Sequence, residues 1–595
     1  MKKTLSIIAI LAVAATACNK AEIDPSNGEL TPTDNLITET VSATSDYNTK
    51  AEIGSEDGVF TWSAGDKIAV HVSDGNYYTT SGLESGGSTS ATFSVDYPSG
   101  FSRDAFAIYP STIVAAAAEN YGQDEHTLDL TLPNTYTLAQ VSNDVTPCPM
   151  IATNAPGSDW EFKQLCGLLR LTVGDIPANT KRLVVSFGGK KVCGDFSITA
   201  PDPGNSVIST SDDASHDYIT ITNGGEDFST SAVLNIPLPV GVYTKVAVVA
   251  FNHLSNGAAL LAGTAGFSYT ANRQRATKKN IALNISHLFS VSESKCVIIA
   301  PSNLQATTEN LGGAWNWHFA TNPWDYNGAS YNSNQRINGD GTTSYNGTVD
   351  LFGWVGASNT AWSGEPGSTL NAAMYGISNS NSNSDYGNVA GESLKSDWGN
   401  TINDPNYTWR TLTEAEWVYL IGIRASGSTV DGKTKNTSSL VITPITVSNA
   451  RYSLASINTT GSTWVNGMII FPDGITIAES EISQRGYINR EIGGTSYDTW
   501  EEATRCTVDQ WTALAAKGCV FLPMTGAYRY REGSNTPVFQ PGTSAGYWSS
   551  SSVDSNAGLA RYLDISKSHV GVDYNKLDND DRKHGHAVRL VRDIN

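Results

Sequence analysis

Short runs in which apolar and polar residues alternate fill the chain between about residues 43 and 290. In KIAVHV the apolar positions are Ile68, Val70 and Val72, and the same spacing recurs in ATFSV, HTLDLTLP, DYITIT and KVAVVAF. A period of two residues is the pattern of strands that bury one face. Turn residues separate the runs, so we predict two β-sandwiches in series, over residues 43–156 and 157–290.

Length and composition agree with a mainly β chain of several domains. A chain of 595 residues is too long for one hydrophobic core, and only 16% of its residues are charged. Long exposed helices need more Glu, Lys and Arg than this. The formal net charge is −20 with no basic cluster, which argues against a nucleic-acid partner and favours a role in solubility.

The composition changes after about residue 290, where a third domain is predicted over residues 297–595. Twelve of the fourteen Trp residues lie beyond Cys296. Two helices are expected here, because Thr413 with Glu416 and Thr507 with Gln510 have the spacing of capping boxes. Trp417, Leu420 and Ile421 give the first helix an apolar face, and Gly518 suits the end of the second, so this domain is predicted to be α+β.

The N-terminus has the anatomy of an export signal. MKKTLSIIAILAVAATAC carries two lysines, an apolar run too short to span a bilayer, and small residues before Cys18. We predict a signal peptide over residues 1–17 and acylation of Cys18, a palmitate-type lipid anchor, followed by a flexible tether over residues 18–42. The alternative is ordinary signal cleavage with Cys18 as an incidental thiol.

The remaining cysteines show no metal-binding spacing. Cys506 and Cys519 are the pair closest in sequence, and either a disulfide or two buried thiols would be compatible with their separation. We predict no cofactor and no metal ligand. The other four are Cys148, Cys166, Cys193 and Cys296.

The first two predicted domains resemble the fimbrillin family, which are lipoprotein pilins of Gram-negative anaerobes. The resemblance rests on FTWSAGDKIAVHV, DAFAIYPS and FKQLCGLLRLTVGDIP, and it covers about residues 43–290. It implies two transthyretin-like sandwiches and assembly by strand exchange, in which proteolysis removes the first strand and a neighbouring subunit fills the groove. Family members are cut after an Arg. Here the first Arg is Arg103, so only Lys50 is placed for a cut, and it is equally well an ordinary strand-edge lysine.

The third predicted domain resembles the C-type-lectin-like fold shared by formylglycine-generating enzymes and many surface proteins. The matching segments are WRTLTEAEWVYLI (409–421), GCVFLPMTGAYRY (518–530), GYWSSSS (546–552) and HAVRLVRD (586–593). The enzymes of that fold use a pair of cysteines near the C-terminal strand, and no cysteine follows Cys519 here. We therefore expect no catalytic residues and no enzyme activity.

Three further features admit a binding role, each with a plainer alternative. His584 and His586, with His569 upstream, are expected to be surface imidazoles rather than metal ligands. The acidic run with Asp573, Asp578, Asp580 and Asp581 lacks EF-hand spacing and is expected to be a solvated turn rather than a calcium site. Trp315, Trp324 and Trp354 are expected in the core rather than stacked on sugars.

Together these patterns predict a surface-exposed lipoprotein of the outer membrane, acting as an adhesin or as a pilus subunit at a filament tip. The partners would be other fimbrillin subunits and a surface glycan or protein ligand, whose identity the sequence does not give. The tip position follows from HAVRLVRDIN, where Ala587, Val588, Leu590 and Val591 are expected to close the third domain's own core instead of serving as a donor strand. The alternative is a glycan-capture lipoprotein that does not polymerise.

Overall fold

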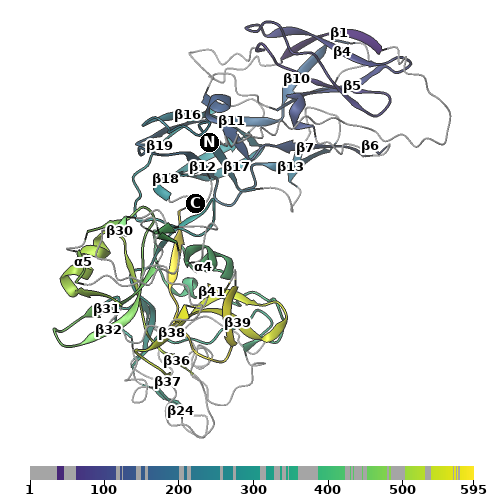
Figure 1. The fold of residues 1–595 in the computed structure, drawn as a ribbon. Coiled ribbons are helices and arrows are strands. Elements are labelled where there is room, and N and C mark those ends of the chain that lie inside the picture. The colour runs from purple at the N-terminus through teal and green to yellow at the C-terminus, as the bar shows by residue number, and fades with distance from the viewer. Residues whose placement is uncertain are drawn as a thin grey trace, which may run out of the picture.

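The computed structural model is mainly β, as the sequence predicts, and its sheets form three bodies along the chain (Figure 1). The structure describes residues 36–594 except for these internal segments: 46–61, 115–120, 123–124, 143–148, 154–157, 200–206, 211–215, 255–258, 272–275, 309–315, 327–334, 338–342, 346, 360–385, 422–428, 431–432, 435–444, 447–451, 479–480, 484–502, 529–537, 567–568, 571 and 574–575.

The first body is one seven-stranded sheet that curls toward closure, where the sequence predicts a two-sheet sandwich. Its order is β3-β2-β5-β9-β10-β1-β4, and its two end strands approach each other, since Ser81 N just after β3 donates to Ser94 O of β4 at 2.9 Å. Trp62 packs at the centre of its core, edge-on to Phe93, Tyr109 and Phe162. The strands are β1 (Leu36–Ser45), β2 (Ala69–Val72), β3 (Tyr77–Thr79), β4 (Ser90–Pro98), β5 (Arg103–Tyr109), β9 (Met150–Thr153) and β10 (Trp160–Gln164).

The second body is a sandwich in which a three-stranded sheet, β16-β11-β19, and a five-stranded sheet, β18-β17-β12-β15-β8, share one core. A four-stranded sheet, β14-β13-β7-β6, adjoins them. The strands are β6 (Tyr121–Gly122), β7 (Glu125–Leu132), β8 (Thr135–Thr137), β11 (Cys166–Gly174), β12 (Arg182–Ser186), β13 (Gly194–Thr199), β14 (Val207–Thr210), β15 (Tyr218–Thr222), β16 (Ala232–Pro239), β17 (Gly241–Phe251), β18 (Ala259–Ala271) and β19 (Ala276–Ala282); short helices are η1 (Ser111–Ile113) and α1 (Leu138–Ser142).

The strands do not divide at the predicted boundaries. β1 begins at Leu36, inside the predicted tether, because Val41 and Ala43 are buried in the first core. β7 and β8 precede residue 156 but pair with β13 and β15 of the second body, while β10 follows residue 157 and pairs in the first sheet. The chain therefore crosses to the second body and returns, and local alternation carries no information about which sheet a strand joins.

The third body combines three main sheets with helices α4 (Glu414–Ile421) and α5 (Val508–Ala516). The sheets are β20-β21-β43-β27, β34-β31-β32-β35 and β38-β39-β42-β41, with β40 beside β39. Their strands are β20 (Phe289–Ser290), β21 (Cys296–Ile299), β27 (Trp409–Thr411), β31 (Tyr452–Asn458), β32 (Trp464–Ile470), β34 (Thr504–Thr507), β35 (Val520–Pro523), β38 (Ser544–Val553), β39 (Asn556–Ser566), β40 (His569–Val570), β41 (Val572–Asp573), β42 (Lys576–Asp581) and β43 (Leu590–Asp593).

Smaller elements complete this body. They are β22 (Leu304–Thr308), β23 (Asn316–Phe319), β24 (Gln335–Ile337), β25 (Thr343–Tyr345), β26 (Gly347–Val349), η4 (Trp398–Thr401), β28 (Thr429–Val430), β29 (Lys433–Thr434), β30 (Ile445–Thr446), β33 (Thr476–Ile477), β36 (Ala527–Tyr528) and β37 (Val538–Phe539).

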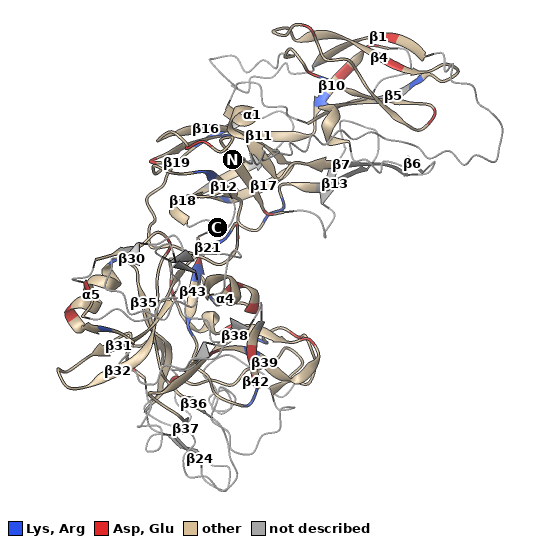
Figure 2. Ribbon diagram, in the orientation of Figure 1, with Lys and Arg blue, Asp and Glu red and all other residues tan. Residues whose placement is uncertain are grey.

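Apolar contacts join the three bodies. Ile108 and Ile151, on strands of the first sheet, belong to the core cluster of the second body. At the other junction Val184, Val249 and Phe251 of the second body pack with Leu288 and Ile594, together with Ala259, Ala262 and Cys296. Figure 2 shows Lys and Arg scattered among Asp and Glu along all three bodies.

Candidate functional site

The first candidate site is the place of β1 in the first sheet. Nine residue pairs join β1 antiparallel to β4, from Leu36 opposite Pro98 to Thr44 opposite Ser90. On its other side β1 runs parallel to β10, with Ala43 opposite Trp160. The chain's first described strand is thus an interior strand, bonded on both edges.

The β1 side chains fix its register. Val41 and Ala43 are buried with Phe93 and Phe162. Glu39 accepts a hydrogen bond from Tyr97 Oη at 2.6 Å and lies 3.0 Å from Arg103 Nε in an ion pair. Burial and the Glu39 carboxylate together raise the pKa of Tyr97. A one-residue slip would move Val41 and Ala43 to the outer face and break these contacts.

The second candidate site is the C-terminal strand β43, which the sequence predicts as a core strand. β43 lies between β21 and β27, antiparallel to both. Ala587, Val588, Leu590 and Val591 are all fully buried, as expected. Beyond them, Ile594 N donates to Cys296 O and the Ile594 side chain enters the junction with the second body.

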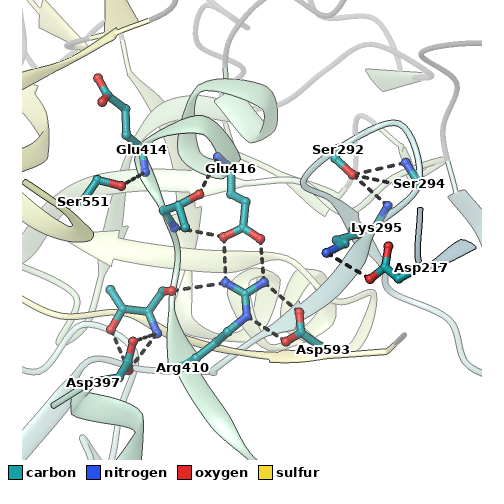
Figure 3. A network of polar contacts seen from close by, with 12 residues as sticks. Asp217, Ser292, Ser294, Lys295, Asp397, Arg410, Glu414, Glu416, Ser551 and Asp593 are labelled. Carbon is teal, nitrogen blue, oxygen red and sulfur yellow. Dashed lines mark hydrogen bonds and ion pairs between the residues drawn. The ribbon is translucent and has the colours of Figure 1, made fainter. Parts of the chain in front are cut away.

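Arg410 joins this strand to the start of α4 (Figure 3). Its guanidinium forms paired hydrogen bonds of 2.6 Å with both oxygens of Glu416 and of 2.7 Å with both oxygens of Asp593. Burial opposes the charge, yet the two carboxylates outweigh it and raise the pKa of Arg410. One arginine therefore holds β27, β43 and α4 together.

The predicted helix start is confirmed at the same place. Glu416 Oε2 accepts from Thr413 N at 2.9 Å, and Thr413 Oγ1 accepts from Glu416 N at 3.2 Å. Trp417, Leu420 and Ile421 are buried, so the apolar face packs on the core. In α5 the Thr507–Gln510 box is also present, and Gly518 has a φ of +87°.

Asp578, Asp580 and Asp581 lie on strand β42 instead of a turn, and Asp581 stays partly exposed. The side chains of His569 and Asp573 are outside the described part of the structure.

Asp580, His584 and His586 form a largely buried cluster, and the burial of His586 corrects the expected surface imidazole. Asp580, on β42, accepts from His584 Nδ1 at 2.8 Å and lies 3.0 Å from His586 Nε2. His586 is fully buried, stacked on Tyr562 with centroids 4.3 Å apart. Burial raises the pKa of Asp580, but the two histidines lower it more, so it lies below its ordinary value.

Arg582 and Glu392 form a second buried pair beside this cluster. The Arg582 guanidinium hydrogen-bonds Glu392 and lies over the ring of Trp354, 4.7 Å from its centroid. Trp354 is fully buried, as expected, and Trp324 is partly buried against the core around Cys506. Within the described segments no group of three or more His, Cys, Asp or Glu residues is arranged to hold a metal ion.

Five cysteines of the described part of the chain are buried and form no disulfide. Cys506 and Cys519 share one apolar cluster without forming a disulfide, and burial raises the pKa of Cys506 to about 12. Cys166, Cys193 and Cys296 are the other three. Cys18, Cys148, Lys50 and Trp315 lie outside the described residues, and so does the predicted signal peptide. None of the helices in the described part of the chain has the length and hydropathy of a membrane span.

The sequence did not predict the role of Asp473, which lies at the junction of the second and third bodies. Asp473, between β32 and β33, accepts from Ala259 N of β18 at 3.2 Å and from Ser290 N of β20 at 3.0 Å, and it also bonds Ser290 Oγ. Asp473 N donates to Leu288 O at 2.8 Å. A lone Asp in FPDG reads as a turn residue, so the sequence carried no signal for this role.

Comparisons with known proteins give only distant structural similarity. No protein-family model and no curated protein matches the chain. A candidate cell adhesion protein from Bacteroides ovatus aligns with 12% identity and a TM-score of 0.25, over 41% of this chain and 92% of that one. A second from Bacteroides uniformis aligns with 19% identity and a TM-score of 0.20, over 37% and 81%. A fimbrial protein from Bacteroides ovatus aligns with 9% identity and a TM-score of 0.18, over 44% and 57%.

Proposed function

We propose that this chain is a fimbrillin-type lipoprotein of the outer membrane, anchored through Cys18, which acts as an adhesin or pilus subunit. Its first body would accept a strand from another fimbrillin subunit, and its C-terminal body, which we propose to be lectin-like, would bind a surface ligand without catalysis. The proposal rests on the chain's own strand arrangement and motifs, because the aligned structures have TM-scores of 0.25 or lower.

The observation that carries the proposal is the interior position of the N-terminal strand. Without β1, the ladder edges of β4 and β10 would both be unpaired, and Phe93, Val95 and Phe162 would lose the side chains packed between them. An unpaired edge above an apolar face is a template for another strand. A donor strand would restore these contacts if it carried an acidic residue in place of Glu39, an apolar residue two positions later in place of Val41, and a small apolar residue after two more positions in place of Ala43.

The pairing of the C-terminal strand supports a position at the tip of a filament. A donor strand has to leave its own domain, and residues 590–593 are bonded on both edges with Arg410 bridging them to α4. Extracting them would cost free energy comparable to that of unfolding a domain, about 5–15 kcal/mol. These residues are therefore not a donor strand.

The rival function is a glycan-capture lipoprotein that stays monomeric. It is favoured by one observation: β1 fills its own groove, with its charged Glu39 matched by Arg103. A chain that never loses β1 needs no partner strand.

Cleavage after β1 separates the two functions. A site-specific protease sequence placed between Ser45 and Trp62 lets β1 be cut from the folded protein, and a peptide of residues 36–45 then serves as the trial donor. We expect the cut protein to bind the peptide and remain monomeric, because the C-terminal strand is not available as a donor, while a peptide with Val41→Asp and Ala43→Asp does not bind. A cut protein that stays monomeric and binds neither peptide contradicts strand exchange.

Two further variants test the anchor and the C-terminal strand. Cys18→Ser should move the protein out of the membrane fraction with its fold unchanged. Deletion of residues 586–595 should unfold the C-terminal body while strand uptake by the first body persists. A truncated protein with an intact C-terminal body that blocks assembly would identify the deleted residues as a donor.

A further inference from the structure

An exposed tryptophan on the β31–β32 hairpin is not used by the core. In the sheet β34-β31-β32, Ile457 lies opposite both Val465 and Cys506, and these three pack into the core cluster around Trp511. Residues opposite each other on paired strands lie on the same face of the sheet, and successive residues of one strand lie on opposite faces. Trp464 precedes Val465, so its side chain projects from the face that points away from this core. It remains 38% exposed, whereas the Trp residues at positions 62, 160, 354, 398, 417 and 548 are fully buried.

Trp464 is paired with an arginine two strands away. Its backbone partner on β31 is Asn458, while Arg505 on β34 lies opposite Ser456. The Arg505 Cζ nevertheless lies over the indole, 4.8 Å from the ring centroid. The two side chains therefore meet across β31 with the guanidinium over the indole, and together they form the Trp464–Arg505 platform on the outer face of the sheet. Figure 1 shows this hairpin at the outer edge of the third body.

Among the described residues, the Arg505 guanidinium has an unused hydrogen-bond donor. In the described part of the structure its guanidinium makes no hydrogen bond and no ion pair, and its Nε is without an acceptor. Arg103, Arg410 and Arg582 each pair with a carboxylate. A guanidinium beside an exposed indole can donate paired hydrogen bonds to an anionic group.

The third body offers an internal comparison. Arg592 lies over the exposed ring of Tyr407, with Cζ 3.6 Å from the centroid, so it has the same kind of partner. Nearby, the pKa of Asp404 is lowered, mainly by hydrogen bonds from Asn406 N and Trp409 Nε1 and to a lesser extent by the charge of Arg592. The Tyr407–Arg592 pair therefore provides a matched control, with an aromatic ring and an arginine at another place in the third body.

We infer that the Trp464–Arg505 platform is a ligand subsite that takes an acidic saccharide, a pyranose bearing a carboxylate. The apolar C–H face of the ring packs on the indole, and the carboxylate accepts paired hydrogen bonds from the guanidinium. An acidic peptide without a ring supplies the negative charge but has no C–H ring face to pack on the indole, so the platform favours the sugar. This inference rests on the proposed adhesin function, to which it adds a ligand class and a place.

The test compares matched sugars on the detergent-solubilised full chain. Binding of methyl β-D-glucuronide, of methyl β-D-glucoside and of a Gly-Glu-Gly peptide is followed by ligand-observed saturation-transfer NMR. We expect the glucuronide to bind about tenfold or more tightly than the glucoside, which corresponds to about 1.4 kcal/mol. Arg505→Gln should remove that preference, and Trp464→Ala should abolish binding of both sugars. The control variants Tyr407→Ala and Arg592→Gln should leave binding unchanged.

Three outcomes overturn the inference. They are a wild-type protein that binds no glucuronide, sugar binding that survives Trp464→Ala, and a peptide that binds as tightly as the glucuronide. Far-UV circular dichroism of Trp464→Ala and Arg505→Gln shows whether either variant has unfolded, and Trp464→Phe and Arg505→Lys then serve in its place, with weakened rather than lost binding expected. Strand uptake after β1 cleavage is measured separately, so failure of the sugar site leaves the proposed assembly function standing.

Discussion

The Arg410 network offers a sharp test, because capping boxes begin both α4 and α5 and the one at α4 also binds an arginine. Glu416 closes the box at the start of α4 and also binds Arg410 through both oxygens. Gln510 closes the box at the start of α5 without an arginine, and it accepts a hydrogen bond from Ser483. We predict that Glu416→Ala destabilises the C-terminal body more than Gln510→Ala does.

The magnitude follows from the bonds lost in each variant. Loss of a cap costs about 0.5–2 kcal/mol, and this applies to both. Glu416→Ala also removes a bidentate partner of a partly buried arginine; a charged hydrogen bond contributes about 1.5–3 kcal/mol, and exposure together with the remaining Asp593 pair reduces that figure. We therefore expect Glu416→Ala to cost about 1–2 kcal/mol more than Gln510→Ala.

Urea unfolding followed by near-UV circular dichroism measures the difference. The double variant Arg410→Ala with Glu416→Ala provides the coupling energy between the two side chains. Equal losses for Glu416→Ala and Gln510→Ala, with no coupling to Arg410, would refute the view that this arginine holds β27, β43 and α4 together.

Three other predictions concern single side chains. Trp417→Ala should lower the free energy of unfolding by about 3–5 kcal/mol, because the ring is fully buried; a thermally neutral variant in calorimetry would contradict its packing. Asp580 has a lowered pKa in the folded protein, so its contribution to stability should be present at neutral pH and be lost as the pH falls below about 4; Asp580→Asn should remove that acid-sensitive part of the melting curve. Asp473→Ala should loosen the second junction and produce a separate melting transition for the third body, whereas Asp473→Asn, which keeps an acceptor, should have a smaller effect; a single unchanged transition in both variants would contradict this role.

Local patterns predicted local structure well and long-range pairing poorly. The capping boxes, the buried Trp417 and the buried Leu590 and Val591 follow from spacing within a few residues, and the structure confirms each. The crossing of β7 and β8 into the second body does not follow, because an alternating strand fits any sheet that offers an apolar face.

The candidate site shows the same division. His584 and His586 are polar residues near the end of the chain, and composition alone places such residues at the surface. The burial of His586 depends on Asp580 and Tyr562, which face it only after β39 and β42 have paired. Likewise, Trp464 and Arg505 lie 41 positions apart in sequence and meet because β31 lies between their strands.

The apolar junctions between the three bodies have a mechanical consequence. Ile108 and Ile151 at one seam, and Phe251 with Ile594 at the other, leave neither connection as a bare linker. A pulling force applied at the β31–β32 hairpin would be transmitted to the second body through the packed side chains and the hydrogen bonds of Asp473. It would not first have to extend a flexible linker. Under the proposed adhesin function, these packed junctions would hold the binding face of the third body at a fixed angle to the first body, so that several copies bound to one surface would lose little orientational freedom.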